Sequence, residues 1–313
     1  MARKQQRCSL RRSPRLQALY RGSPNKQVVG VVKSEVAEPD DANALVSLSE
    51  AMSTTGTILL DCTEVYNILN QAGQYPRLSD PNYLLLLDTR QSHDYSESHI
   101  ITAKYAPRND IGAFTVPHDA ELQTKEHVVV YDSNTSSLKD KNSTALSCAK
   151  LMWEMESKNP VKIIKGGYEE FSAMYPFLRT QKIVYMPREL DVINTYPVEI
   201  IPGFLYVATF GQSQDQKIIK DLKVKANVIV AKEINDTVFA AESTTLGREE
   251  KRVNQKLSVP IDDNGEEDLH SHLSDIVNFI DDHFTNDGRT VLLTSTLGIS
   301  RSVAVAIALL HVE

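Results

Sequence analysis

A run of apolar and β-branched residues near the C-terminus, Thr290 to Thr294, leads into a short loop and then into an alanine-rich stretch. We interpret the three parts as a strand, an anion-binding loop and a helix. Such a loop suits an anion, because unpaired backbone N–H groups and the positive end of the helix dipole meet there. Arg301 can add two hydrogen bonds to phosphate oxygens. The predicted phosphate-binding residues are Ser295, Thr296, Leu297, Gly298, Ile299, Ser300, Arg301 and Ser302.

The loop resembles the His-Cys-x-x-Gly-x-x-Arg loop of cysteine-dependent phosphatases, but it has Thr294 and Ser295 where that pattern has His and Cys. Phosphate-ester transfer through a cysteine needs a thiolate, and a thiol with a pKa of about 8.5 can be ionised by a helix N-terminus and nearby cations. A serine hydroxyl ionises many units higher and needs an adjacent general base. The sequence therefore predicts a loop that binds phosphate without cleaving phosphate esters. The plain alternative is a glycine turn that enters a buried helix.

Two upstream segments resemble the dual-specificity phosphatases. Residues 259–263 predict a strand end that opens into an acidic loop, at the distance from Ser295 where that family has its general acid. The resemblance assigns Asp263 to this position, with Asp262 beside it. Residues 196–207 resemble the opening hairpin of the family. The resemblance implies a dual-specificity phosphatase-like domain in which Thr294, Ser295 and Asp263 are degenerate catalytic positions and no catalytic residue is functional.

The first half of the chain resembles a rhodanese-like domain. An apolar run ends at Asp88-Thr-Arg90, and His99-Ile-Ile-Thr-Ala103 follows. A second apolar run, residues 128–131, precedes Gly166-Gly-Tyr-Glu-Glu-Phe171. A sulfur-transferring rhodanese needs a cysteine directly after the second run, where this chain has Asp132-Ser-Asn-Thr-Ser136. This domain therefore also lacks its nucleophile, and we expect Asp88 and Arg90 to organise the strand end and the following loop.

The order of the two domains resembles the architecture of mitogen-activated protein kinase phosphatases, and the serine in place of the cysteine resembles the serine/threonine/tyrosine-interacting-like pseudophosphatases. The expected fold class is α/β, with a rhodanese-like domain followed by an incomplete dual-specificity phosphatase-like α/β domain. The second domain is expected to be incomplete because such domains continue through further helices beyond position 313. The predicted ranges are 1–56 for a disordered basic tail and linker, 57–185 for the rhodanese-like domain, 186–198 for a linker and 199–313 for the truncated phosphatase-like domain.

Periodicity predicts how helices and strands alternate along the chain. In the first half we expect helices at 63–71 and 143–156 and strands at 84–88, 127–131 and 161–164. In the second half we expect strands at 199–201, 204–207, 227–230, 256–260 and 290–294, with helices at 215–222, 267–284 and 302–311. This alternation predicts parallel sheets with helices on both faces. His270 and His272 fall outside the apolar stripe of their helix and are expected at the surface.

Length and composition fit two α/β domains, since the chain has 313 residues, of which 41% are hydrophobic. No apolar run approaches the roughly 20 residues that span a bilayer. The cysteines at positions 8, 62 and 148 form neither a metal-ligand spacing nor a disulfide framework, which indicates reducing surroundings. We expect no metal site and no cofactor.

Residues 1–34 contain nine Lys or Arg and no acid, although the whole chain has a net charge of −7. A segment of this composition buries too little apolar surface to fold alone. Three interpretations stay open: a mitochondrial transit peptide, a basic nuclear or RNA-binding patch, and an extension without a function. We expect a cytoplasmic protein that binds no membrane, with a mitochondrial or nuclear location as the alternatives.

Three functions stay open as well. The first is a pseudophosphatase that binds phosphorylated proteins, active phosphatases or protein kinases and regulates phosphorylation without turnover. The second is a weak phosphatase that uses Asp263 and a bound water, and the third is a truncated product that acts only through its rhodanese-like domain. The family docks kinases through basic residues after His-Ile-x-x-Ala, where this chain offers only Lys104 and Arg108, so docking of mitogen-activated protein kinases is doubtful. We expect Arg301 to face an anion and to contribute little to the fold.

Overall fold

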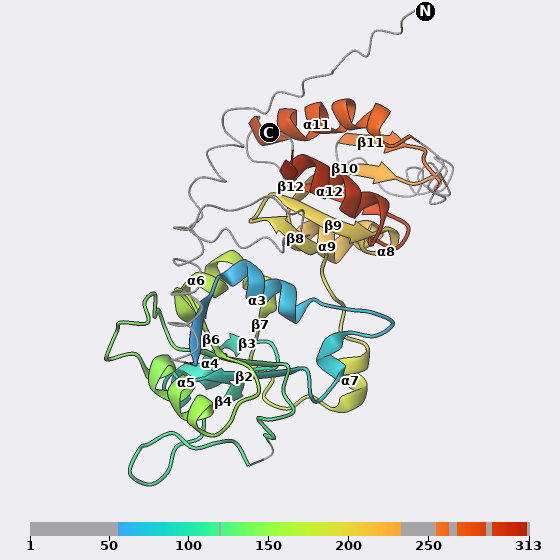
Figure 1. Cartoon of the computed structure of the whole chain (residues 1–313). Helices are drawn as coiled ribbons and strands as arrows, with labels where there is room; N and C mark the ends of the chain where they lie inside the picture. Colours follow the sequence, from blue (N-terminus) through green and yellow to red (C-terminus); the bar gives the residue numbers. More distant parts are fainter. Residues whose placement is uncertain (1–55, 119, 233–254, 263–267, 286–289, 312–313) are drawn as a thin grey trace, which may run out of the picture. The chain divides into compact units, whose positions relative to one another are not determined.

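The computed structural model describes residues 56–118, 120–232, 255–262, 268–285 and 290–311 (Figure 1). They form two compact units, of which the first ends at Thr195 and the second begins at Tyr196. The predicted tail lies outside the described residues, as does Asp263. No helix in the described ranges is long and apolar enough to cross a membrane.

The N-terminal unit is built on a sheet of five parallel strands. Their bounds are β1 Thr57–Leu60, β2 Leu84–Asp88, β4 Lys104–Tyr105, β5 His127–Tyr131 and β6 Val161–Ile164. They lie in the order β1-β6-β5-β2-β4. Leu84 pairs with His127 and Asp88 with Tyr131, so β2 and β5 end at the same edge of the sheet. The loops that follow these two strands, and the side chains they carry, are therefore brought together at that edge.

Helices flank this sheet. Their bounds are α3 Cys62–Leu69, α4 Ser92–Glu97, α5 Thr144–Glu154, α6 Gly167–Met174 and α7 Pro187–Asp191. The short elements are the 3-10 helices η1 Arg77–Ser79 and η2 Pro176–Leu178 and the antiparallel pair β3 His99–Ile100 and β7 Arg179–Thr180. α5 covers one face, where Cys148 and Met152 pack among residues of the strands. The rings of Tyr66 and Tyr175 stack with centroids 4.6 Å apart and join α3 to the end of α6.

Prediction and structure agree for the strands at 84–88, 127–131 and 161–164. Strands of a covered parallel sheet appear in the sequence as continuous apolar runs, because both of their faces are buried. Several shorter elements lie outside the prediction, among them β1, α4, β4 and α6. β1 is a short strand next to the predicted tail, and α6 begins at Gly167, whose φ of +57° is no helix-start signal. The predicted linker 186–198 contains α7, which contacts η1.

Titratable side chains gather where β5 begins. Nδ1 of His127 lies 2.5 Å from Nζ of Lys162 on β6, and Nε2 lies 3.8 Å from the carboxylate of Glu126. The imidazole also meets the ring of Tyr83 edge-on. Burial and the charge of Lys162 lower the pKa of His127 below its usual 6.5. The folded unit therefore favours a neutral His127 whose Nδ1 accepts a hydrogen bond from Lys162.

We expect the N-terminal unit to lose stability as the pH falls below about 6.5, because the unfolded chain then takes up a proton that folded His127 resists. The loss continues down to the lowered pKa and amounts to about 1.4 kcal/mol for each unit of that shift. Urea unfolding, followed by the fluorescence of Trp153, the only tryptophan, measures it at about pH 7.5 and about pH 5. His127→Gln should remove most of this pH dependence; if the variant keeps it, His127 is not its source.

The C-terminal unit also has a five-stranded sheet. Its strands are β8 Val198–Ile201, β9 Leu205–Thr209, β10 Val224–Val230, β11 Gln255–Val259 and β12 Thr290–Ser295. They lie in the order β11-β10-β12-β9-β8, in which β8 and β9 form an antiparallel hairpin and the other neighbours are parallel. β12 lies at the centre, so its carboxyl end is flanked by β9 and β10.

The helices of this unit are α8 Phe210–Gln214, α9 Gln216–Asp221, α11 His270–Thr285 and α12 Arg301–His311. α11 contributes Ile276 and Ile280 to the core, and α12 contributes Val305. His270 and His272 are exposed, as predicted. The predicted strand at 290–294 and helix at 302–311 agree with β12 and α12 to within one residue.

Candidate functional site

The loop between β12 and α12 is held against the neighbouring strand β9. Gly298 has a φ of +70°, and a Cβ at this position would lie 3.1 Å from backbone atoms of Ala208 and Thr209. The N–H of Phe210 also donates to the carbonyl of Thr296 at 3.4 Å. Because a side chain would be strained here in both respects, the loop requires a glycine at its middle.

Ser295, the predicted degenerate nucleophile, lies at the end of β12 and is only 2% exposed. Its hydroxyl is 2.8 Å from the hydroxyl of Ser302 in the first turn of α12. It also accepts a hydrogen bond from the N–H of Gly298 at 3.1 Å. Neither of these partners is a general base that could remove the proton of the hydroxyl. The structure thus brings Ser295, Gly298 and Ser302 together, as the sequence predicts.

Thr294 is fully buried and donates a hydrogen bond to Oδ1 of Asn227 on β10 at 2.6 Å. The hydroxyl therefore joins β12 to β10. Asn227 is a site residue that lies outside the sequence prediction. Its signal is a polar side chain, only 3% exposed, among the apolar buried residues of β10.

The expectation that Arg301 faces an anion and contributes little to the fold is wrong in its second part. The side chain is 5% exposed. Nη1 donates to the carbonyl of Ile261 at 2.5 Å, and Nη2 donates to the hydroxyl of Thr296 at 3.0 Å. The guanidinium therefore joins the segment after β11 to the predicted phosphate loop, and its loss would release both.

The predicted acidic loop begins at the segment that Arg301 holds. Ile261 is buried, and the carboxylate of Asp262 forms an ion pair with Nζ of Lys232 at 2.7 Å. Asp263, the predicted general-acid position, lies outside the described residues. The described geometry therefore places the start of this loop beside Arg301.

Two apolar side chains flank Gly298 at the surface. Leu297 is 64% exposed and Ile299 is 72% exposed. The predicted loop residues therefore divide into a buried group, which contains Ser295, Arg301 and Ser302, and an exposed group, in which these two apolar residues lie beside Thr296 and Ser300. A ligand that reached the loop would meet hydrophobic surface beside it.

In the N-terminal unit, the loop after β5 surrounds a carboxylate. Asp132 accepts hydrogen bonds from the N–H of Thr135 at 2.9 Å, the hydroxyl of Thr135 at 2.6 Å and the hydroxyl of Ser143 at 3.0 Å. The N–H groups of Asn134 and Ala145 donate to it as well, each at 3.2 Å. Burial raises the pKa of Asp132, but these hydrogen bonds outweigh burial and hold it below its usual value. An internal anion thus takes the loop donors that a bound anion would need.

Asp88 and Arg90 form a buried ion pair, as the prediction of a structural role requires. Nε and Nη2 of Arg90 donate to the carboxylate of Asp88 at 3.1 Å and 2.6 Å, and Nη2 also donates to the carbonyl of Ser98 at 2.6 Å. Arg108, one of the two cations considered for kinase docking, donates to the carbonyl of Thr89 at 2.9 Å and lies over the ring of Phe114. The guanidinium of Arg108 therefore already has a carbonyl and an aromatic ring as partners within its own domain.

The described part of the chain contains no candidate metal-binding site. There, no group of three or more His, Cys, Asp or Glu side chains lies close enough together to hold a metal ion. Cys62 and Cys148 are buried free thiols, and burial raises the pKa of Cys148 to about 12. Neither lies in the loops described above.

Two family models match the chain. Residues 205–311 match the model of the dual specificity phosphatase, catalytic domain, and residues 72–174 match that of the rhodanese-like domain. The two matches fall on the C-terminal and N-terminal units, respectively. The predicted α/β fold class, with a rhodanese-like domain followed by a dual-specificity phosphatase-like domain, is confirmed.

Two similar proteins are named as dual specificity protein phosphatases. Dual specificity protein phosphatase 16 of Homo sapiens is 26% identical over 72% of this chain and 35% of its own length. A protein of Dictyostelium discoideum, "Probable rhodanese domain-containing dual specificity protein phosphatase", is 26% identical over 50% of this chain and 31% of its own length. This chain thus spans about a third of both relatives. The crystal structure of human tyrosine phosphatase-like serine/threonine/tyrosine-interacting protein has 23% identity and a TM-score of 0.27, covering 36% of this chain and 70% of that chain.

Proposed function

Because this chain carries a rhodanese-like domain followed by a dual-specificity phosphatase-like domain, we propose that it is a pseudophosphatase of the serine/threonine/tyrosine-interacting-like kind. In this proposal it binds phosphorylated proteins, active phosphatases or protein kinases, and it regulates phosphorylation without hydrolysing phosphate esters. Docking of mitogen-activated protein kinases through Lys104 and Arg108 stays doubtful, because Arg108 is engaged within its own domain.

One observation carries the proposal: the nucleophile position is a serine whose hydroxyl is bonded to Ser302 and to the N–H of Gly298. A serine hydroxyl becomes a nucleophile only when a base removes its proton. Thr294, at the position of the preceding histidine, donates a hydrogen bond to Asn227 and so is not a base for Ser295. Ser295 therefore has hydrogen-bond partners and no activating base among the described residues.

The same loop supports binding. α12 begins at Arg301 and directs its N-terminus toward the loop, and this end of a helix favours negative charge. The exposed side chains of Leu297 and Ile299 flank the loop and favour a ligand with apolar neighbours. We therefore propose a phosphorylated residue within a partly apolar protein segment as the ligand.

Gly298→Ala tests the binding loop. We expect the unchanged chain to bind a fluorescently labelled phosphopeptide without releasing phosphate, and the variant to bind it about tenfold more weakly. The physical reason is that an alanine at this positive φ, with backbone atoms 3.1 Å from its Cβ, must shift the loop and with it the N–H groups that would bind phosphate; tenfold corresponds to about 1.4 kcal/mol. Fluorescence anisotropy measures binding, and a phosphate-release assay measures turnover.

Gly211→Ala is the matched control, since a Cβ there meets only the Thr209 hydroxyl oxygen, at 3.9 Å, and needs no positive φ. This variant should bind like the unchanged chain. Phosphate release by the unchanged chain would contradict the proposal. So would equal affinities of the two glycine variants, because the peptide would then bind elsewhere.

A further inference from the structure

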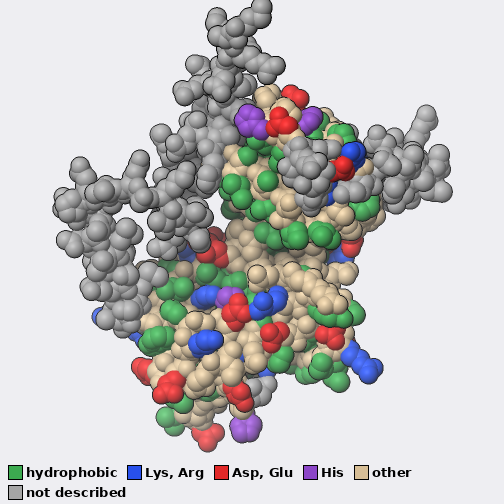
Figure 2. All heavy atoms as spheres, turned by 45° about the vertical axis from the view of Figure 1, so that its right-hand side comes forward, with side chains coloured by type: hydrophobic (Ala, Val, Ile, Leu, Met, Phe, Trp, Pro, Cys, Tyr) green, Lys and Arg blue, Asp and Glu red, His purple; other side chains and the backbone are tan. Residues whose placement is uncertain are grey.

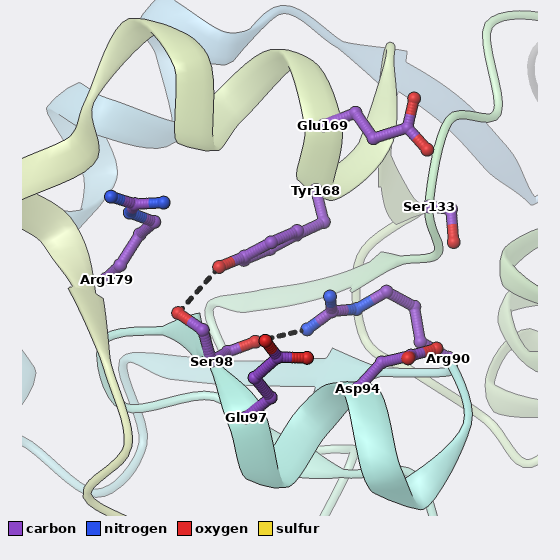
Figure 3. Close-up of a pocket in the computed structure, with 8 residues that line it drawn as sticks. All are labelled: Arg90, Asp94, Glu97, Ser98, Ser133, Tyr168, Glu169 and Arg179. Atoms are coloured by element: carbon purple, nitrogen blue, oxygen red, sulfur yellow. Dashed lines mark hydrogen bonds between the residues drawn. The ribbon is translucent and has the colours of Figure 1, made fainter.

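A cavity of about 390 Å³ opens in the rhodanese-like domain between α4, α6 and the loop after β5 (Figure 3). The residues that line it are Arg90, Asp94, Glu97, Ser98, Ser133, Tyr168, Glu169 and Arg179. Ligand pockets in proteins usually measure roughly 300–1,000 Å³, so the cavity has room for a few side chains at most. The pseudophosphatase proposal uses none of these residues.

The floor of the cavity is an arginine whose charge is already compensated. Arg90 pairs with Asp88, and its Cζ lies 3.7 Å from the centroid of the Tyr168 ring. The hydroxyl of Tyr168 donates to the hydroxyl of Ser98 at 2.7 Å, as Figure 3 shows. Arg90 therefore holds the aromatic wall in place and adds little net positive charge for an anionic ligand.

The acidic side chains of the cavity are not compensated in this way. Glu97 comes from α4 and Glu169 from α6, so that carboxylates from two separate helices line the cavity (Figure 3). Among the ion pairs of the described residues, none includes Glu97 or Glu169. Asp94 has only the highly exposed His93, at 3.6 Å. With Arg179 as the one other cation of the lining, the cavity carries an excess of negative charge.

Charged side chains of both signs are also common on the surface (Figure 2). Figure 2 shows basic and acidic side chains interspersed over the described part of one face. A ligand selected by charge alone would therefore find many weak contacts, whereas this cavity combines carboxylates from two helices with an aromatic ring. A guanidinium fits the carboxylates, because it donates to them in pairs, while one face of the Tyr168 ring is already covered by Arg90.

We propose that the cavity binds arginine side chains of the chain's own basic segment, residues 1–34. This segment has nine Lys or Arg and no acid, and it belongs to the same molecule, so its effective concentration at the cavity is high. The occupied cavity would then be closed to arginine-bearing segments of other proteins until the basic segment is displaced. This inference is independent of the pseudophosphatase proposal.

The test uses a labelled synthetic peptide of residues 1–34 as the probe and fluorescence anisotropy as the readout. The first protein is the unchanged chain, and the second carries Arg7→Gln, Arg11→Gln, Arg12→Gln and Arg15→Gln. We expect the second protein to bind the peptide at least about tenfold more tightly, because its own segment no longer competes. Adding Glu97→Gln and Glu169→Gln to it should weaken binding by about tenfold or more, since the carboxylates are lost.

Glu121→Gln with Glu154→Gln is the matched control, because these carboxylates are exposed in the same domain, outside the cavity, and the change in net charge is the same. The control pair should leave the affinity unchanged. Equal weakening by both pairs would overturn the proposal in favour of unspecific charge attraction. Equal affinity of the first two proteins would also overturn it, because the chain's own segment would not be the occupant. The fluorescence of Trp153 verifies that each variant is folded.

Discussion

Replacing Ser295 by cysteine and Thr294 by histidine is expected to give this chain measurable hydrolysis of a fluorogenic phosphate ester. The structure already has two donors for a thiolate at this place, the hydroxyl of Ser302 at 2.8 Å and the N–H of Gly298 at 3.1 Å from the Ser295 oxygen. Hydrogen bonds to the charged form and a helix N-terminus both lower the pKa of a thiol. We expect a rate about 100-fold or more above that of the unchanged chain, the scale of one acid–base group.

The single variant Ser295→Cys tests the nucleophile without changing Thr294. Thr294 is fully buried and bonded to Asn227, so a histidine there needs more space and must donate to the same oxygen. The single variant avoids this demand. Its introduced thiol should react with iodoacetamide near neutral pH, while the buried Cys62 and Cys148 should not, as peptide mapping by mass spectrometry can show.

Ser302→Ala in the Ser295→Cys background is the control for the cause of this reactivity. Loss of the Ser302 hydroxyl should raise the pKa of the introduced thiol and slow its labelling. Circular dichroism verifies the fold of each variant. Folded variants without labelling and without turnover would contradict the prediction, because the loop would then fail to stabilise an anion at position 295.

Asp88→Ala is expected to lower the free energy of unfolding of the rhodanese-like domain by about 3–5 kcal/mol, the usual cost of removing one partner from a buried ion pair. Asp88 is fully buried, and the side chain of Arg90 is 7% exposed. Without the carboxylate, the guanidinium keeps the carbonyl of Ser98 and the ring of Tyr168 but has no opposite charge. Urea unfolding followed by Trp153 fluorescence measures the change in this domain alone.

Glu189→Ala is the matched control, because its ion pair with Lys182 lies in the same domain but at the surface, where solvent screens the charges. It should change the unfolding midpoint little. Asp88→Leu with Arg90→Met should cost less than Asp88→Ala alone, since no buried charge is then left without a partner. Equal destabilisation by Asp88→Ala and Glu189→Ala would contradict the role assigned to the buried pair.

The elements that were predicted well share one physical property: the pattern of buried and exposed side chains along each of them is enough to identify it. Apolar runs predicted β2, β5, β6 and β12, and the apolar stripe of α11 predicted both that helix and the exposure of His270 and His272. Elements that depend on contacts with the rest of the domain lie outside the prediction. α6 is an example, because a Cβ at Gly167 would lie 2.5 Å from the carbonyl oxygen of Asp132, so that its first residue is set by the neighbouring loop.

The amino-acid sequence by itself determined the two α/β domains, the loop between the last strand and the last helix, and the residues at positions 294 and 295. These features are local, since each is visible in a short stretch of residues. Only the tertiary structure decided which hydrogen-bond partner each polar group has. Arg301 reaches Ile261 across 40 positions and Thr294 reaches Asn227 across 67, and Glu97 and Glu169 line one cavity. Such pairings follow from the order and register of the strands and the packing of the helices, which bring together residues that are distant in the sequence.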